Sequence, residues 1–97
     1  MRALVANRSS ASGVSITETP EPQVDPGEAL VEVHAVSLNR GEVRRLPTRE
    51  EGTIPGWDVA GVVLDGPQAG TRVVGLADGG GWAERVAIPT VKQHRAD

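Results

Sequence analysis

The sequence predicts a mainly β fold, a small antiparallel barrel or sandwich, and three observations support this prediction. The 97 residues include 14 valines, and β-branched side chains favour strands. Twelve glycines and seven prolines interrupt the chain too often for long helices. Short apolar segments also recur between Gly- or Pro-rich turns, which is typical of small all-β domains.

The predicted strands follow one another from the N-terminus. Residues 2–6 (RALVA) and 14–19 (VSITET) flank a turn rich in Ser and Gly, so we expect a hairpin. Residues 29–38 (ALVEVHAVSL) form the longest candidate strand. Its alternation places four residues on one face, namely Ala29, Val31, Val33 and Ala35. Three further strands are expected at residues 58–66, 71–77 and 82–88.

One segment, residues 38–52 (LNRGEVRRLPTREEG), lacks the alternation of a strand. Asn39 and Glu42 stand three residues apart and match a helix-capping pattern, in which the amide caps backbone donors and the carboxylate reaches back. Pro47 ends any helix within two turns. We therefore expect a single helical turn over residues 40–46.

Two arginines of this turn are candidates for binding an anion. Arg40 and Arg44 are four residues apart, so a helical turn places them on the same face. Two interpretations remain open. Either these side chains contact a phosphate group close to the free N–H groups of the turn, or they are solvated arginines on a capped surface turn.

Composition excludes several classes of function. A net charge of −3 and a pI near 5.3 give no positive field for nucleic acid or an anionic membrane. The absence of cysteine excludes disulfides, thiolate zinc sites and a cysteine nucleophile. No apolar run approaches the ~20 residues of a membrane span, and the first residues lack the apolar stretch of a signal peptide. We expect a cytoplasmic protein with no nucleic-acid or membrane partner.

Four stretches, in this order along the chain, carry a resemblance to a known family: MRALV, PGEALVEVHAVSLNRGEV, IPGWDVAGVV and GTRVVGLADGGGWAERVAIP. Together they resemble the N-terminal, GroES-like catalytic domain of the medium-chain dehydrogenase/reductases, in the zinc-independent quinone oxidoreductase-like branch. The resemblance implies a small antiparallel barrel with one or two short helical turns. We expect this GroES-like domain at residues 1–89, followed by a polar tail at residues 90–97.

The resemblance implies that no zinc is bound. In the zinc-dependent alcohol dehydrogenases, a His follows the Pro-Gly turn and a Cys stands at the position of Asn39, and both bind the catalytic metal. Here the first of these positions carries Trp57, whose indole nitrogen is a donor only. His34 and His94 have no nearby partner at ligand spacing and do not restore the pattern.

The resemblance also suggests which residues contact a cofactor. In the zinc-independent branch the position of Asn39 lies near the nicotinamide and ribose, so Asn39 is the first candidate for a contact with NADPH. Arg40 matches a position that often contacts the cofactor pyrophosphate, for which a guanidinium fork is well suited, and Arg44 is a second candidate. Gly41 stands where alcohol dehydrogenases carry the hydroxyl residue of a proton relay, so that relay is not expected.

Two residues are candidates for the substrate cleft. Trp57 either offers a flat apolar wall to a quinone or enone substrate or anchors the core. Asp58 is better suited to holding nearby backbone donors or an arginine than to catalysis. No residue stands out as a general acid, so we assign no catalytic residue.

Complete enzymes of this family bind NADPH between the barrel and a Rossmann domain, whose Gly-rich turn holds the pyrophosphate. This chain contains no GxGxxG or GxxxxGK motif and no βαβ pattern. We therefore expect the Rossmann domain to be absent from the chain, as in a fragment, a truncated gene product or a standalone domain.

Two functions remain as the main hypotheses. The first is the catalytic-domain portion of a zinc-independent, NADPH-dependent oxidoreductase that reduces quinones or conjugated carbonyls by hydride transfer and is inactive alone. The second is a non-catalytic GroES-like binding or scaffold module that packs on a partner, such as a second copy or a Rossmann domain. A co-chaperonin role would need an apolar mobile loop, and residues 20–28 and 39–51 lack the apolar side chains for one.

Overall fold

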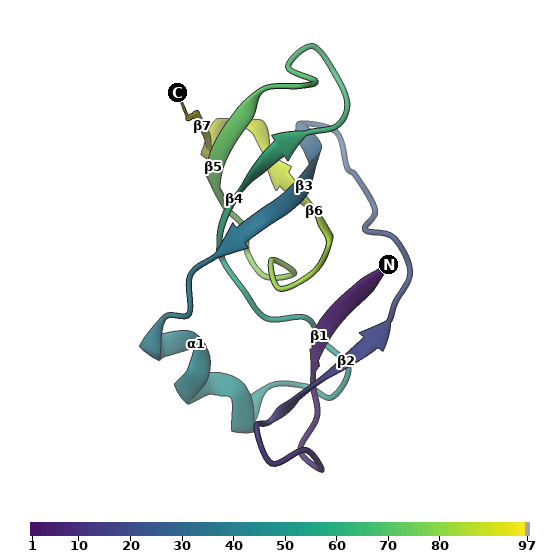
Figure 1. Ribbon diagram of the computed structural model, residues 1–97, viewed down its shortest axis with the longest axis vertical. Helices are drawn as coiled ribbons and strands as arrows, with labels where there is room; N and C mark the ends of the chain where they lie inside the picture. The colour runs from purple at the N-terminus through teal and green to yellow at the C-terminus, as the bar shows by residue number, and fades with distance from the viewer. Residues whose placement is uncertain (97) are drawn as a thin grey trace.

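The structure, a computed structural model, describes residues 1–96. A five-stranded antiparallel sheet forms one part of it. Its order is β6-β3-β4-β5-β7, and its strands are β3 (Glu28–Val36), β4 (Asp58–Val63), β5 (Arg72–Leu76), β6 (Arg85–Pro89) and β7 (Gln93–Arg95). The sheet is curled (Figure 1), and the side-chain amide of Gln93 at the start of β7 donates to the Ile88 carbonyl of β6 at 2.9 Å, which links the two outer strands. The predicted mainly β, GroES-like small antiparallel barrel is confirmed.

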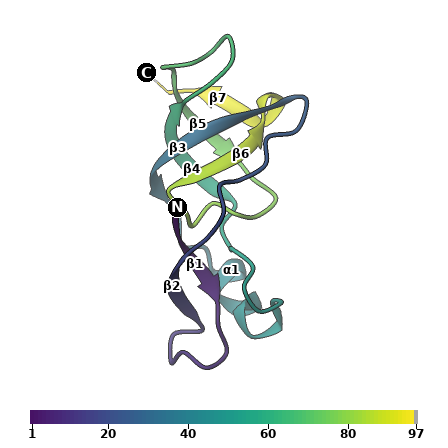
Figure 2. The ribbon, with the colours of Figure 1, turned by 90° about the vertical axis from the view of Figure 1, so that its right-hand side faces the viewer.

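The second part is a hairpin with a short helix. Strands β1 (Arg2–Ala6) and β2 (Val14–Glu18) pair antiparallel, as predicted. Helix α1 (Arg40–Arg45) is followed by the 3₁₀ turn η1 (Leu46–Thr48), which contains Pro47. Figures 1 and 2 show the hairpin and α1 together at the end of the molecule opposite to β7.

The main cluster of buried side chains lies inside the curled sheet and is entirely aliphatic, whereas the buried Trp82 lies outside it. The cluster consists of alternate residues from four strands, together with Ala77 just after β5: Ala29, Val31, Val59, Val63, Val73, Ala77, Val86 and Ile88. Gly61 allows β3 and β4 to approach closely, since a Cβ there would overlap the Glu32 carbonyl oxygen. The valine-rich composition therefore forms a packed barrel interior without any aromatic side chain.

Two details of the predicted strands are wrong. A bulge in β3 between Val33 and Ala35 shifts the register, so Ala35 is exposed and does not share the core face of Val31 and Val33. Strand β6 begins at Arg85 rather than at residue 82. The reason is that Trp82 lies in a bend, where its backbone N–H donates to the Pro55 carbonyl at 2.9 Å.

The C-terminal residues add to the sheet. The 3₁₀ turn η2 (Thr90–Lys92) leads into β7, which pairs with β5. Asp97, the last residue of the predicted polar tail, lies outside the described residues. Within residues 1–96, no helix is long and apolar enough to cross a membrane.

Candidate cofactor and substrate site

Asn39 and Asp58 meet because the end of β3 lies beside the start of β4. Val36 pairs with Val59 across these strands, and the Ser37 N–H donates to the Asp58 carbonyl at 3.4 Å. The chain leaves β3 toward Asn39 and re-enters the sheet at Asp58. The Asn39 side-chain nitrogen therefore reaches Asp58, donating to its Oδ2 at 2.9 Å.

Glu42 is the buried centre of this site, with a relative exposure of 1%. Its Oε1 accepts from the Asn39 backbone N–H at 3.1 Å and from the Asn39 side-chain nitrogen at 2.9 Å, and its Oε2 accepts from the Trp57 N–H at 2.9 Å. A carboxylate is kept in a buried position only when its oxygens have such partners. The predicted reach of this carboxylate back to the helix start is confirmed, and it also holds the Trp57 backbone.

The Trp57 indole lies on α1. A Cβ built at Gly41 would be 3.1 Å from Cη2 of the ring, and the Arg45 guanidinium lies 5.8 Å from the ring centroid. This distance is within the range of a cation–π interaction. The ring thus lies where a larger side chain at residue 41 would project.

The Pro55-Gly56 turn sets the direction of the chain before Trp57. Gly56 has a φ of +107°, and a Cβ there would be 2.7 Å from the Trp82 nitrogen. Only glycine combines this φ with so close an approach. The turn is tied to the segment before β6, since Gly81 N–H donates to the Gly56 carbonyl at 3.0 Å.

Arg40 and Arg44 lie on the exposed side of α1, directly after Asn39 in the chain. Across residues 1–96 neither guanidinium group forms a hydrogen bond or an ion pair. Their donors are therefore available to an anion from solvent. The structure brings Asn39, Trp57 and Asp58 together around Glu42, and places these two arginines on the adjoining helix.

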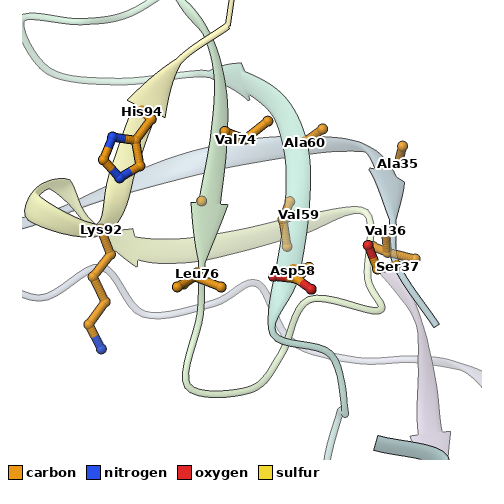
Figure 3. A pocket seen from close by; sticks show the side chains of 11 residues that line it. Ala35, Val36, Ser37, Asp58, Val59, Ala60, Val74, Leu76, Lys92 and His94 are labelled. Atoms are coloured by element: carbon orange, nitrogen blue, oxygen red, sulfur yellow. The ribbon is translucent and has the colours of Figure 1, made fainter. Parts of the chain in front are cut away.

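Next to Asp58 the outer face of the sheet is hollowed into an open depression of about 350 Å³. Figure 3 shows its lining: Val74 and Leu76 from β5, residues from the end of β3, and Lys92 and His94 on one side. Asp58 pairs with Leu76 at its edge. The Trp57 side chain is not part of this lining. A mostly apolar concave surface with a few polar groups is typical of sites for small organic molecules.

The donor groups at the two expected metal positions do not suit zinc. Trp57 offers only an N–H donor, and the Asn39 amide nitrogen already donates to two carboxylates. Among residues 1–96, no group of three or more His, Cys, Asp or Glu side chains is placed to hold a metal ion.

Two features of the site are not visible in the sequence. The bond from the Trp57 N–H to Glu42 spans 15 residues, and the contact between Trp57 and Arg45 spans 12. Neither spacing corresponds to a local rule for helices or strands. The only signal was the acidic residue three positions after Asn39, which pointed to capping alone.

No protein-family model matches the chain. It is similar to the trans-enoyl reductase milB of Cordyceps militaris, with 36% identity over 88 residues that cover 80% of this chain and 25% of that protein. It is also similar to a probable mitochondrial zinc-binding oxidoreductase of Arthroderma benhamiae, with 44% identity over 52 residues that cover 50% of this chain and 16% of that protein.

Among solved structures, it resembles the quinone oxidoreductase of Thermus thermophilus, a protein whose structure is also known in complex with NADPH. The TM-score is 0.78 and the identity 34%, covering 96% of this chain and 31% of that one. The chain thus spans about a quarter to a third of these two relatives, the enoyl reductase and the quinone oxidoreductase. The matches confirm the resemblance to the GroES-like domain of the medium-chain dehydrogenase/reductases.

Proposed function

We propose that this GroES-like domain is the catalytic-domain portion of a zinc-independent, NADPH-dependent cytoplasmic oxidoreductase that reduces quinones or conjugated carbonyls. The observation that carries the proposal is the hydrogen bond from Asn39 to Asp58, a residue that lines an open and mostly apolar depression. Arg40 and Arg44 follow Asn39 on α1, and among residues 1–96 their guanidinium groups form no hydrogen bond or ion pair. The names of the relatives, a quinone oxidoreductase studied with NADPH and an enoyl reductase, support it.

In this proposal α1 and the residue before it hold part of the cofactor. Arg40 contacts the pyrophosphate and Arg44 assists from the same exposed face, since guanidinium groups form paired hydrogen bonds with phosphate oxygens. Asn39 contacts the nicotinamide half. When bound, NADPH supplies the hydride.

The substrate lies beside Asp58 and Trp57. The apolar lining from β3 and β5 accepts the ring or chain of a quinone or enone, and Asp58 lies at its edge. Trp57 directly precedes Asp58 in the chain, and its ring lies outside this lining, against α1. This chain orients the reactants and excludes water on one side. No contact in the site identifies a side chain as a general acid, so we assign no catalytic residue.

The rest of the cofactor site is proposed to come from a second domain. The chain covers 31% of the quinone oxidoreductase that was studied with NADPH, so two thirds of such a protein has no counterpart here. A Rossmann domain, in the same polypeptide or as a partner, would supply the remaining phosphate contacts. Without it we expect no turnover.

A second function is favoured by one observation. Leu76, in the lining of the depression, is 52% exposed, and Leu38, which follows the lining residue Ser37 in the chain, is 72% exposed. Exposed apolar side chains of this kind favour packing against another protein surface. A non-catalytic binding or scaffold module that packs on a partner, or on a second copy, would use the same face.

The test is turnover by the protein as its own source produces it. We expect oxidation of NADPH that depends on added 1,4-benzoquinone or an α,β-unsaturated ketone and that is unchanged by a zinc chelator. A protein that binds a partner but oxidises NADPH with neither acceptor would support the scaffold function instead. Loss of activity with the chelator would contradict zinc independence.

A further inference from the structure

The side-chain amide of Asn39 has both of its N–H hydrogens committed within the protein. Its nitrogen donates to Glu42 Oε1 and to Asp58 Oδ2, each at 2.9 Å. An amide nitrogen carries two hydrogens, and ionised carboxylates only accept. This orientation of the amide gives both carboxyl oxygens a donor, whereas the flipped orientation would place the amide oxygen against them.

The Glu42 carboxylate is held by hydrogen bonds of its own, and Asp58 is anchored through its backbone. Glu42 is 1% exposed, and its other oxygen accepts from the Trp57 N–H at 2.9 Å, so the carboxylate cannot turn toward solvent without losing three bonds. Asp58 is the first residue of β4 and is paired with Leu76. Asn39 itself is half-buried beside them.

What Asn39 can offer a ligand follows from this arrangement. Its N–H groups are used, whereas an amide oxygen has two lone pairs, of which the start of a helix takes at most one. The side chain can thus accept a hydrogen bond from a ligand but cannot donate one. A ligand group that carries only hydrogen-bond acceptors could not form a hydrogen bond with the amide oxygen, and both groups would be left unsatisfied.

We propose that Glu42 and Asp58 are positioning residues that lock Asn39 as an acceptor for a hydrogen-bond donor on the nicotinamide half of NADPH. The donor is either a ribose hydroxyl or the carboxamide N–H. This inference rests on the proposed function, since it assigns Asn39 a role toward that cofactor.

The first test needs no ligand. Asn7 and Asn39 are the only asparagines among these 97 residues, so labelling asparagine with ¹⁵N gives each of them one NH₂ pair in this chain. Asn7 donates to Ser15 Oγ at 3.2 Å and serves as an internal control. Both Glu42→Gln and Asp58→Asn should shift the Asn39 pair and leave the Asn7 pair unchanged. An Asn39 pair that responds to neither variant would overturn the proposed locking.

The second test is a double-mutant cycle on the dissociation constant of NADPH, measured with the full natural protein. Asn39→Ala and Glu42→Gln should each weaken binding by about three- to tenfold, the range for one hydrogen bond. The double variant should be no weaker than the more affected single variant, because Glu42 acts through Asn39. Asp58→Asn repeats the cycle if Glu42→Gln does not fold.

A matched control acid lies away from the site. Asp65 also accepts from a backbone N–H, that of Leu30 at 2.8 Å, so Asp65→Asn should leave NADPH binding unchanged.

The acetylpyridine analogue of NADPH, which lacks the carboxamide N–H, distinguishes the two possible donors on the cofactor. If wild-type protein loses affinity for the analogue and Asn39→Ala does not, the carboxamide is the donor. If Asn39→Ala weakens both ligands equally, the ribose hydroxyl is the donor.

The remaining outcomes distinguish the failure of this inference from the failure of the proposed function. Additive losses in the cycle would mean that Glu42 does not act through Asn39, and they would overturn this inference while leaving the proposed function in place. Failure of the wild-type protein to bind NADPH would overturn the proposed function, and with it the role of Asn39 toward the cofactor.

Discussion

The barrel and the α1 end of the molecule differ in what surrounds their most buried side chains. In the barrel, Val31 and Ile88 are fully buried among other aliphatic side chains. At the α1 end, the residue with the lowest exposure is a carboxylate, Glu42, and the contacts around it are hydrogen bonds. Apolar packing tolerates small shifts in side-chain position, whereas hydrogen bonds fix direction. The difference indicates that the α1 end is built to orient groups and the barrel to support them.

The largest expected effect is on the barrel. Ile88→Ala removes a side chain with 0% exposure from the core, and we expect unfolding free energy to fall by about 2–5 kcal/mol. Urea denaturation measures the loss. Ile16→Ala is the matched control, because Ile16 on β2 is 74% exposed and its truncation should change stability by less than about 0.5 kcal/mol.

The Ile88 variant also tests whether the barrel and the α1 end are independent of each other. In its folded state the Asn39 side-chain resonances should keep their wild-type positions, because the hydrogen bonds around Glu42 do not involve the core. A displaced Asn39 pair in folded Ile88→Ala would show that the barrel and the α1 end are not separate in this way.

A smaller effect is expected where Trp57 lies on α1. Replacing glycine by alanine inside a helix stabilises it by up to about 1 kcal/mol, but a Cβ at Gly41 would be 3.1 Å from the Trp57 ring. Gly41→Ala should therefore stabilise the protein less in the wild type than in a Trp57→Leu background. The two differences in unfolding free energy are measured in urea. Equal gains in both backgrounds would show that the ring does not restrict residue 41.

Much of the barrel could be predicted from the sequence because its determinants are local. Alternating valines, Gly-rich turns and the capping pair Asn39 and Glu42 predicted the hairpin, the central strands and the single helical turn. The errors have physical causes that lie elsewhere in the chain. The bulge that exposes Ala35 depends on the register with β4, and the bend at Trp82 depends on a hydrogen bond to Pro55.

The site was predictable only in part. Local sequence and family resemblance identified Asn39, Arg40, Arg44, Trp57 and Asp58 as candidates, but their roles toward a cofactor or substrate stay predictions. The sequence alone does not decide whether Trp57 is a wall of the cleft or an anchor of the core. The structure places its ring on Gly41 and Arg45, outside the aliphatic core. The central role of Glu42 depends on its hydrogen bond with the Trp57 N–H, 15 residues away. The periodicity of the sequence does not predict a contact at this spacing.

The most direct test of the central claim is the dissociation constant of NADPH for the full natural protein, compared between wild type and Arg40→Ala. Arg72→Ala is the control, since Arg72 is an exposed arginine on β5 away from α1. If α1 holds the cofactor phosphates, Arg40→Ala should raise the constant about tenfold, which corresponds to ~1.4 kcal/mol, and Arg72→Ala should leave it unchanged. An unchanged constant for Arg40→Ala, or an equal rise in both variants, would contradict the account.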